Sequence, residues 1–187
     1  QRQGAVAIYQ DVWHKDIFRF LNLKTNNGDE RLKAHDIFTG VCIPDLFMEA
    51  VEKRESWYLF EGLYTQNILG FRLEDHYDEK KGDGSFRKYY AKAIEAAEDG
   101  LLPKNAYEKV EAIEIMKAIM KSLLETGVPY LFFRDEVNRK NPNKHQGMIY
   151  CSNLCTEIFQ NLSATRITEE YVNEEGKIII EKTPGDF

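Results

Sequence analysis

Three polar side chains with complementary chemistry lie at alternate positions near the carboxyl end of the sequence. They are Asn153, Cys155 and Glu157, in the run NLCTE. In an extended chain, alternate side chains point to the same face and lie roughly 7 Å apart. The spacing therefore predicts one surface that carries an amide, a thiol and a carboxylate together.

This combination favours chemistry in which the thiol keeps its hydrogen. A neighbouring carboxylate disfavours a second negative charge, so Glu157 opposes the formation of a thiolate at Cys155. A thiol in that form suits hydrogen-atom exchange better than nucleophilic attack. Glu157 could then take a proton from a substrate hydroxyl, and Asn153 could hydrogen-bond a developing carbonyl.

Two other interpretations of the same run remain open. A five-residue pattern of this kind arises often by chance, and a buried cysteine usually serves as a small hydrophobic residue. Cys155 could also be the nucleophile of a hydrolase or transferase, in which case its thiol would be alkylated readily near neutral pH. The three residues alone do not decide between these alternatives.

The other cysteines are not expected to form a metal or disulfide site. Cys151 lies four residues before Cys155 and near His145, but two thiols and one histidine leave a metal one ligand short. An extended chain would separate the two sulfurs by roughly 13 Å, too far for a disulfide. Cys42 lies in an apolar stretch and is predicted to be core. Three cysteines in 187 residues favour a reducing, cytoplasmic compartment.

Charge and hydropathy argue against several classes of protein. The net charge is −6 at pH 7, which disfavours broad binding to nucleic-acid polymers. No apolar run reaches the roughly 20 residues of a membrane-spanning helix, and no secretory signal is recognisable. With 43% hydrophobic and 30% charged residues, the sequence fits one globular domain or a piece of one.

Strands and helices are predicted to alternate, which indicates an α/β class with mostly parallel strands. Strands are predicted where β-branched and aromatic residues cluster, and helices where apolar residues recur at helical spacing. Two regions are expected to be irregular, 61–84 and the polar, turn-rich stretch 136–147. The predicted strands are 4–13, 36–43, 57–60 and 128–135, with a hairpin after residue 163; the predicted helices are 14–24, one beginning at Pro44, 86–99 and 105–127.

The run YCSNLCTEI resembles the finger-loop signature of class I and class II ribonucleotide reductase large subunits. Other segments resemble the same family, in the family's order: RQGAVAIYQDVWHKDIFRFL, LKTNNGDERLKAHDIF, IPDLFMEAV and ETGVPYLFFRDEVNRKNPNKHQGM. The resemblance extends over residues 2–160.

This resemblance implies a fold and a set of catalytic residues. Residues 1–187 would be part of the catalytic barrel domain, a ten-stranded α/β barrel made of two five-stranded parallel half-sheets. The finger loop would cover about 143–159, and the flanking parts of the barrel would be absent. Cys155 would be the thiyl radical that abstracts the 3′-hydrogen of the ribose, Glu157 would take the 3′-hydroxyl proton, and Asn153 would support the ketyl intermediate.

The resemblance also implies partners. No cofactor would be bound by this segment itself. The radical would come from a metal-radical small subunit or, alternatively, from adenosylcobalamin, and the electrons from thioredoxin or glutaredoxin. The substrate would be a ribonucleoside di- or triphosphate. Arg2, Gln3 and Gly4 would belong to the loop that reports a bound effector nucleotide to the substrate base.

The two ends of the sequence suggest that the chain is one part of a larger subunit. It opens without methionine in a predicted strand and ends at EKTPGDF, where the family would continue into a cysteine-bearing strand. We expect no turnover by this segment alone, because the electron-supplying cysteines and the radical-transfer residues would lie outside it. A split or intein-interrupted gene is one hypothesis. The alternative function is that of an inactive segment that only binds a nucleotide or a partner subunit.

Overall fold

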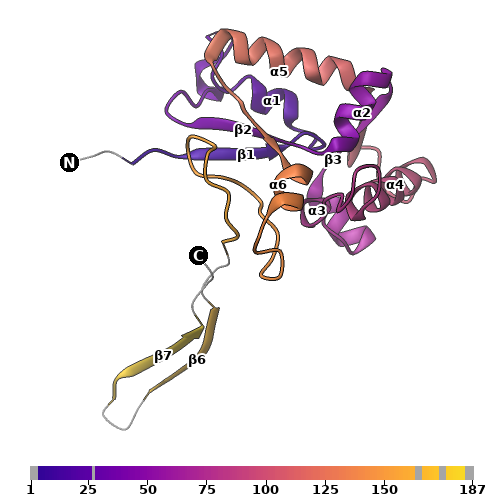
Figure 1. The fold of residues 1–187 in the computed structure, drawn as a ribbon. Helices are drawn as coiled ribbons and strands as arrows, with labels where there is room; N and C mark the ends of the chain where they lie inside the picture. Colours follow the sequence, from indigo (N-terminus) through magenta and orange to yellow (C-terminus); the bar gives the residue numbers. More distant parts are fainter. Residues whose placement is uncertain (1–3, 27, 163–165, 173–175, 184–187) are drawn as a thin grey trace.

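A parallel sheet of three strands, in the order β1-β2-β5, forms the centre of the molecule (Figure 1). The computed structural model describes residues 4–26, 28–162, 166–172 and 176–183, and only the backbone at 166–170 and 179–183. The strands are β1 (Ala7–Asp11), β2 (Phe38–Ile43) and β5 (Tyr130–Phe133). Their register aligns Tyr9 with Gly40 and Cys42 with Phe132.

The two faces of this sheet have different neighbours. Alternate residues of a strand share a face, so Tyr9, Cys42 and Phe132 lie on one side. Val41 and Ile43 point to the other side and are buried in the main core. Both faces of the middle strand β2 are covered, so its sequence is a continuous apolar run and not an alternation of apolar and polar residues. This run is the pattern from which the strand was predicted.

A second, antiparallel sheet adjoins the end of β1. It pairs β3 (Ser56–Phe60) with β4 (Tyr107–Glu111). Beyond β1, the chain forms an isolated parallel bridge between His14 and Phe60. Backbone bonds from the Phe60 N–H to the Trp13 carbonyl (2.8 Å) and from the Lys15 N–H to the Phe60 carbonyl (3.0 Å) hold the two sheets together.

Helices cover the main core, which contains a group of aromatic rings. The Trp57 ring stacks on Tyr90 with centroids 4.4 Å apart, and Phe47 meets it edge-on at 5.1 Å. α5 packs against both α1 and α2 (Figure 1). The helices are α1 (Ile17–Leu21), α2 (Asp45–Lys53), α3 (Gly62–Tyr64), α4 (Ser85–Glu98), α5 (Ala112–Thr126) and α6 (Arg134–Lys140), with shorter turns at Glu30–Leu32, Thr65–Leu69 and Leu73–Asp75.

Most predicted elements are confirmed, and two are corrected. The helix predicted at 105–127 begins only at Ala112, because residues 107–111 pair with β3 as strand β4. The stretch predicted to be turn-rich after residue 136 instead continues α6 as far as Lys140. The helix after Pro44, the helix near 86–99 and the four strands within 4–13, 36–43, 57–60 and 128–135 are found, some of them shorter than predicted.

The C-terminal hairpin is confirmed, with β6 (Arg166–Val172) antiparallel to β7 (Ile178–Thr183). In Figure 1 it extends away from the rest of the described chain. The prediction of mostly parallel strands holds for the central sheet only. The described strands form no closed barrel, so the structure is a mixed α/β arrangement. None of the described helices is both long and apolar enough to cross a membrane.

Candidate active site

The loop that follows α6 lies over the face of the central sheet that carries Cys42 and Phe132. Ile149, at its start, is 1% exposed and packs with these two residues in a small core of their own. At its far end, the Phe159 ring lies 5.7 Å from the ring of Phe132. The sheet therefore supports the segment 149–159, here called the Cys155 loop, at both ends.

Hydrogen bonds fix the start of this loop. The Asn138 side chain in α6 donates to the Ile149 carbonyl at 3.0 Å and accepts from the Ile149 N–H at 2.7 Å. The Cys42 thiol on β2 donates to the Tyr150 carbonyl at 3.8 Å. Asn138 is 1% exposed and its amide is paired in both directions, so α6 gives the loop a fixed starting point.

The functional run forms a turn, which corrects the extended geometry predicted from its sequence. The Thr156 N–H donates to the Asn153 carbonyl at 3.2 Å, and Thr156 has a φ of 62°. Alternation of side chains between two faces does not apply in a turn, and neither does the 13 Å sulfur separation inferred from it. Cys155 lies within the turn and is exposed.

The turn brings Asn153 and Glu157 together. The Asn153 amide nitrogen donates to Glu157 Oε1 at 2.8 Å, and its oxygen accepts the N–H groups of Glu157 at 3.2 Å and Ile158 at 3.0 Å. The Asn153 N–H in turn donates to the Ile158 carbonyl at 3.3 Å. An exposed thiol thus lies on a turn that an amide–carboxylate pair closes. These groups could exchange a hydrogen atom and a proton with a bound alcohol.

Tyr9 is a component of this site that the sequence did not reveal. Its hydroxyl lies 2.6 Å from Ser152 Oγ and 2.9 Å from Thr156 Oγ1, on either side of Cys155. Its ring lies over Gly40, where a Cβ atom would come within 2.4 Å of the ring. A glycine in the middle of a strand signals such a close approach, and that signal was available in the sequence.

Buried charges lie beneath the loop. Arg134 is 3% exposed, and its Nη2 lies 2.6 Å from Asp11 Oδ1. Burial raises the pKa of the Asp11 carboxyl, although Arg134 acts against this. Burial also raises the pKa of the Cys42 thiol to about 12, with a further contribution from Asp11. Cys42 is therefore a core thiol, as predicted, and it stays protonated at neutral pH.

Of the other predicted site residues, the structure describes only Gly4. Arg2 and Gln3 lie outside the described residues. Gly4 is exposed, and apart from its chain neighbours no described atom lies within 4 Å of the position its Cβ would take. Among the described residues, no group of three or more His, Cys, Asp or Glu side chains could hold a metal ion.

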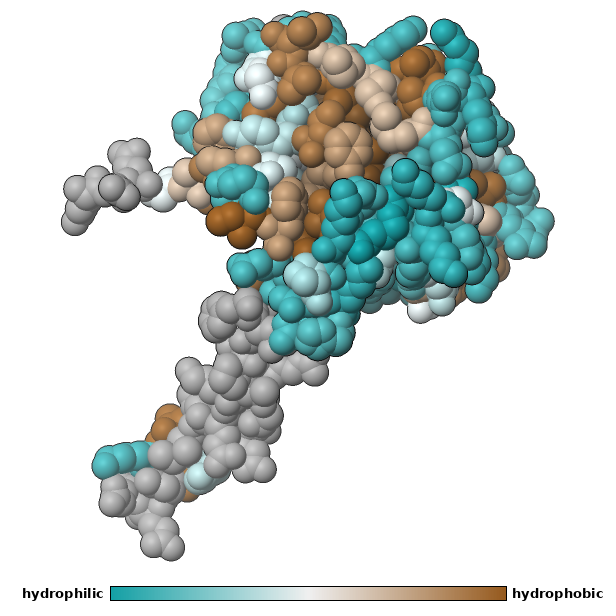
Figure 2. All heavy atoms as spheres, in the orientation of Figure 1, coloured by the Kyte–Doolittle hydropathy of each residue, from teal (hydrophilic) through white to brown (hydrophobic). Residues whose placement is uncertain are grey.

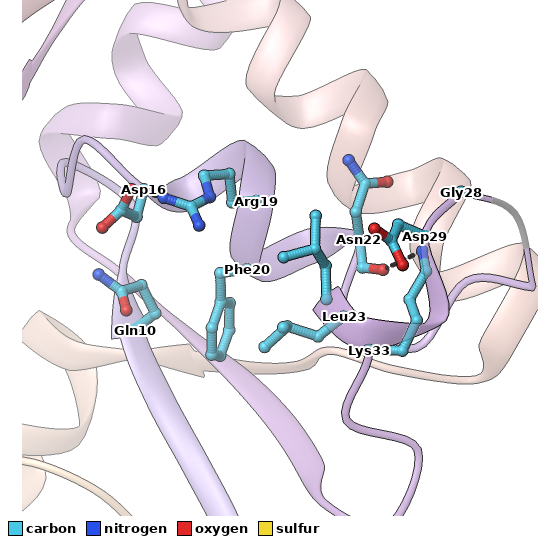
Figure 3. A pocket seen from close by; sticks show the side chains of 10 residues that line it. Gln10, Asp16, Arg19, Phe20, Asn22, Leu23, Gly28, Asp29 and Lys33 are labelled. Carbon is cyan, nitrogen blue, oxygen red and sulfur yellow. Dashed lines mark hydrogen bonds and ion pairs between the residues drawn. The ribbon is translucent and has the colours of Figure 1, made fainter.

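A hollow of about 810 Å³ lies elsewhere, between α1 and the 22–33 segment (Figure 3). In Figure 3, Lys33 reaches toward the backbone of Asn22, and its ammonium donates to the Asn22 carbonyl at 2.9 Å. None of the Cys155 loop residues lines this hollow. It is therefore separate from the candidate active site.

The sheet and the Cys155 loop together define an α/β domain that presents a thiol beside an amide and a carboxylate. The sequence profile of the ribonucleotide reductase barrel domain matches residues 1–175, and the chain therefore belongs to this family. It is 46% identical over 191 aligned positions to the ribonucleoside-diphosphate reductase subunit alpha of Treponema pallidum, covering all of this chain and 21% of that protein.

Two further relatives agree. The subunit alpha of Synechocystis is 39% identical, with 87% of this chain and 20% of that protein covered. The large subunit of Dictyostelium discoideum is 38% identical, with 89% of this chain and 17% of that protein covered. The chain thus spans about a fifth of the length of the relatives it matches.

Proposed function

We propose that this chain is the part of a ribonucleotide reductase large subunit that carries the radical cysteine. The observation that carries the proposal is the hydrogen-bonded pair of Asn153 and Glu157, which closes the turn around the exposed Cys155 in a member of this family. The reaction is the reduction of a ribonucleotide to a 2′-deoxyribonucleotide. In the whole enzyme this segment belongs to the ten-stranded barrel, with 143–159 as its finger loop.

Each site residue has one role in the proposed reaction. Cys155, as a thiyl radical, takes the 3′-hydrogen atom of the ribose and returns a hydrogen atom at the end. Glu157 accepts the 3′-hydroxyl proton, and the 2′-hydroxyl leaves as water. Asn153 hydrogen-bonds the oxygen at C3′ as it becomes a carbonyl. A dithiol elsewhere in the subunit supplies two electrons and two protons, one of which leaves with the 2′-hydroxyl as water, and is oxidised to a disulfide, so atoms and electrons balance.

The substrate and partners follow from the same proposal. The relatives are named ribonucleoside-diphosphate reductases, which favours diphosphate substrates. Their designation as alpha or large subunits favours a radical-generating small subunit over adenosylcobalamin. Thioredoxin or glutaredoxin would restore the dithiol, and Arg2, Gln3 and Gly4 would take part in the response to an effector nucleotide. The enzyme would act in the cytoplasm, where its free cysteines stay reduced.

Replacement of Cys155 tests the proposal. Cys155→Ser, made in the full-length subunit with its radical-generating partner, should lower deoxyribonucleotide formation by at least about 1,000-fold, because serine cannot form an equivalent radical. Both thiols are exposed, so Cys151→Ser is a matched control and should keep activity within about threefold. Persisting activity in Cys155→Ser would show that another residue carries the radical.

A further inference from the structure

A single hydroxyl, that of Tyr9 on β1, connects the two ends of the Cys155 turn. It lies within hydrogen-bond distance of Ser152 Oγ at 2.6 Å and of Thr156 Oγ1 at 2.9 Å. Ser152 in turn donates to the Asn153 carbonyl at 2.9 Å. One arrangement satisfies every group: Thr156 donates to Tyr9, Tyr9 to Ser152, and Ser152 to Asn153. Hydrogen bonds in such a chain strengthen one another.

The position of this hydroxyl is set by the sheet. A Cβ atom at Gly40 would lie 2.4 Å from Tyr9 Cε1, so the ring crosses β2 where a side chain is missing. The ring also meets Phe132 edge-on, with centroids 5.9 Å apart. Packing on both sides leaves the ring little freedom. Tyr9 can therefore transmit the rigid geometry of the parallel sheet to an otherwise exposed turn.

The turn needs such support because its backbone is strained. Thr156 has a φ of 62°, a strained conformation that β-branched residues rarely adopt. Such conformations persist only where surrounding contacts enforce them. At Thr156 the side-chain hydroxyl forms a hydrogen bond with that of Tyr9. Loss of that contact would let the residue beside Cys155 relax toward ordinary backbone angles and shift the thiol.

We propose that Tyr9 is a positioning residue for the radical chemistry: its hydroxyl, placed by the gap at Gly40, holds the strained turn that presents Cys155 to the substrate. The inference rests on the proposed function and adds to it the residue that fixes the reacting sulfur. Tyr9 itself takes no part in the reaction. Its effect is on the fraction of molecules in which the thiol is correctly placed.

Tyr9→Phe tests this in the full-length subunit assembled with its radical-generating partner. The variant keeps the ring and its packing and removes only the hydroxyl. We expect kcat to fall about tenfold, the effect of losing one or two neutral hydrogen bonds, while KM changes less than threefold. Backbone amides of 152–158 should exchange hydrogen about tenfold faster in the resting protein, without substrate or radical. Tyr130→Phe is the matched control, since Tyr130 is half-buried on the same sheet face and its ring stacks on Phe38.

A second variant keeps the inference testable if Tyr9→Phe fails to fold. Ser152→Ala removes a partner of Tyr9 from the loop side and leaves the sheet untouched, so it should lower kcat and speed exchange in the same direction. If both variants keep normal kcat and normal exchange at 152–158, the inference is wrong. A lower melting temperature with unchanged kcat would also overturn it, because that result defines a purely structural role. Cys155→Ser distinguishes the two proposals, since it abolishes activity under the proposed function whatever Tyr9 does.

Discussion

Asn153 uses both polar atoms of its side chain within the Cys155 loop, which makes it the most constrained of the three predicted catalytic residues. Its amide nitrogen meets the Glu157 carboxylate, and its oxygen accepts two backbone N–H groups. An asparagine in this position supplies a donor and an acceptor at once, without adding charge. An aspartate has the same shape but could supply the donor only when protonated.

Asn153→Asp should therefore lower kcat in the full-length enzyme by about 10- to 100-fold at pH 7, because two carboxylates would face each other at 2.8 Å. Activity relative to wild type should recover as the pH falls, since protonation of one carboxyl restores an O–H···O bond. The measurement is a pH profile of kcat for both proteins.

Asn161→Asp is the control for this prediction. The Asn161 amide donates to the Gln146 carbonyl at 3.0 Å, outside the turn. The substitution introduces the same change in charge as Asn153→Asp. It should keep activity within about twofold. If the Asn153→Asp enzyme had a normal pH profile of kcat, the hydrogen bond that the Asn153 amide donates to Glu157 would be dispensable.

At the level of single residues, the sequence predicted which groups meet but not how they meet. The types and order of Asn153, Cys155 and Glu157 were enough to propose their chemistry. Their geometry depends on the positive φ of Thr156 and on the hydroxyl of Tyr9, which is 147 residues away from it. Local sequence periodicity carries no information about a contact at that separation. The extended conformation predicted for residues 153–157 was therefore wrong.

At the level of elements, the two corrections have different causes: a tertiary contact at residues 107–111 and a polar composition in α6. Residues 107–111 look helical because apolar residues continue from the next helix, yet they pair with β3, and Lys109 lies 5.1 Å above the Tyr58 ring. α6 was missed because its composition is polar. Its acidic first turn and basic last turn suit a helix dipole and were a usable signal.

The first turn of α6 also contains a buried carboxylate that links this helix to α2 and to the loop at Asp78. Asp135 is fully buried and accepts the N–H groups of Asp45, at the start of α2, at 2.6 Å and of Asp78 at 2.9 Å. Burial raises the pKa of the Asp135 carboxyl to about 6, against a usual value of 3.8, although the two N–H groups oppose this. The folded protein therefore binds this proton more tightly than the unfolded chain.

This raised pKa predicts how stability depends on pH. The contribution of protonated Asp135 is fully present below about pH 4 and is lost as the pH rises through about 6. Asp135→Asn mimics the neutral form of this residue. Relative to that variant, the free energy of opening α2 and α6 in the wild type should fall by about 2 kcal/mol between pH 4 and 6. Native-state hydrogen exchange of the full-length subunit measures this free energy.

Glu136→Gln provides the contrast on the same helical turn. Hydrogen bonds from Arg139 and Lys140 lower the pKa of Glu136 to about 2, so its contribution is present above its usual value of 4.5 and is lost only as the pH falls toward 2. Between pH 5 and 7 the opening free energy of this variant should differ from that of the wild type by an amount that does not change with pH. The role of burial would be contradicted if the wild-type opening free energy, relative to that of Asp135→Asn, stayed constant or rose from pH 4 to 6.

At the level of the whole molecule, large apolar side chains are exposed along α5. Leu124 on α5 is 84% exposed and Met120 is 44% exposed, and both line an apolar groove along this helix with Ile113 and Met116. Figure 2 shows apolar residues gathered across the face that carries α5 and β5. Within the described residues, β1 and β5 are also edge strands, each paired with β2 alone. Open edges and apolar grooves favour self-association.

We therefore expect the isolated chain to associate with itself and to bind a hydrophobic dye, and to become active only when combined with the remaining parts of the subunit. Leu124→Lys should have opposite effects in the two settings. In the isolated chain it should reduce self-association, because a charge interrupts the apolar groove. In the full-length subunit it should lower the melting temperature by several degrees, because the same charge would be buried without a partner.

Light scattering of the isolated chain and thermal unfolding of the full-length subunit measure these two effects. Leu101→Lys is the control in the isolated chain, since Leu101 is 60% exposed and does not line the groove; it should reduce self-association much less. An isolated chain that is monomeric and binds no dye would contradict the expectation, and so would Leu124→Lys if it left the full-length subunit as stable as wild type. The second result would mean that the α5 groove faces solvent in the intact enzyme, and that its apolar residues serve no interface with the rest of the subunit.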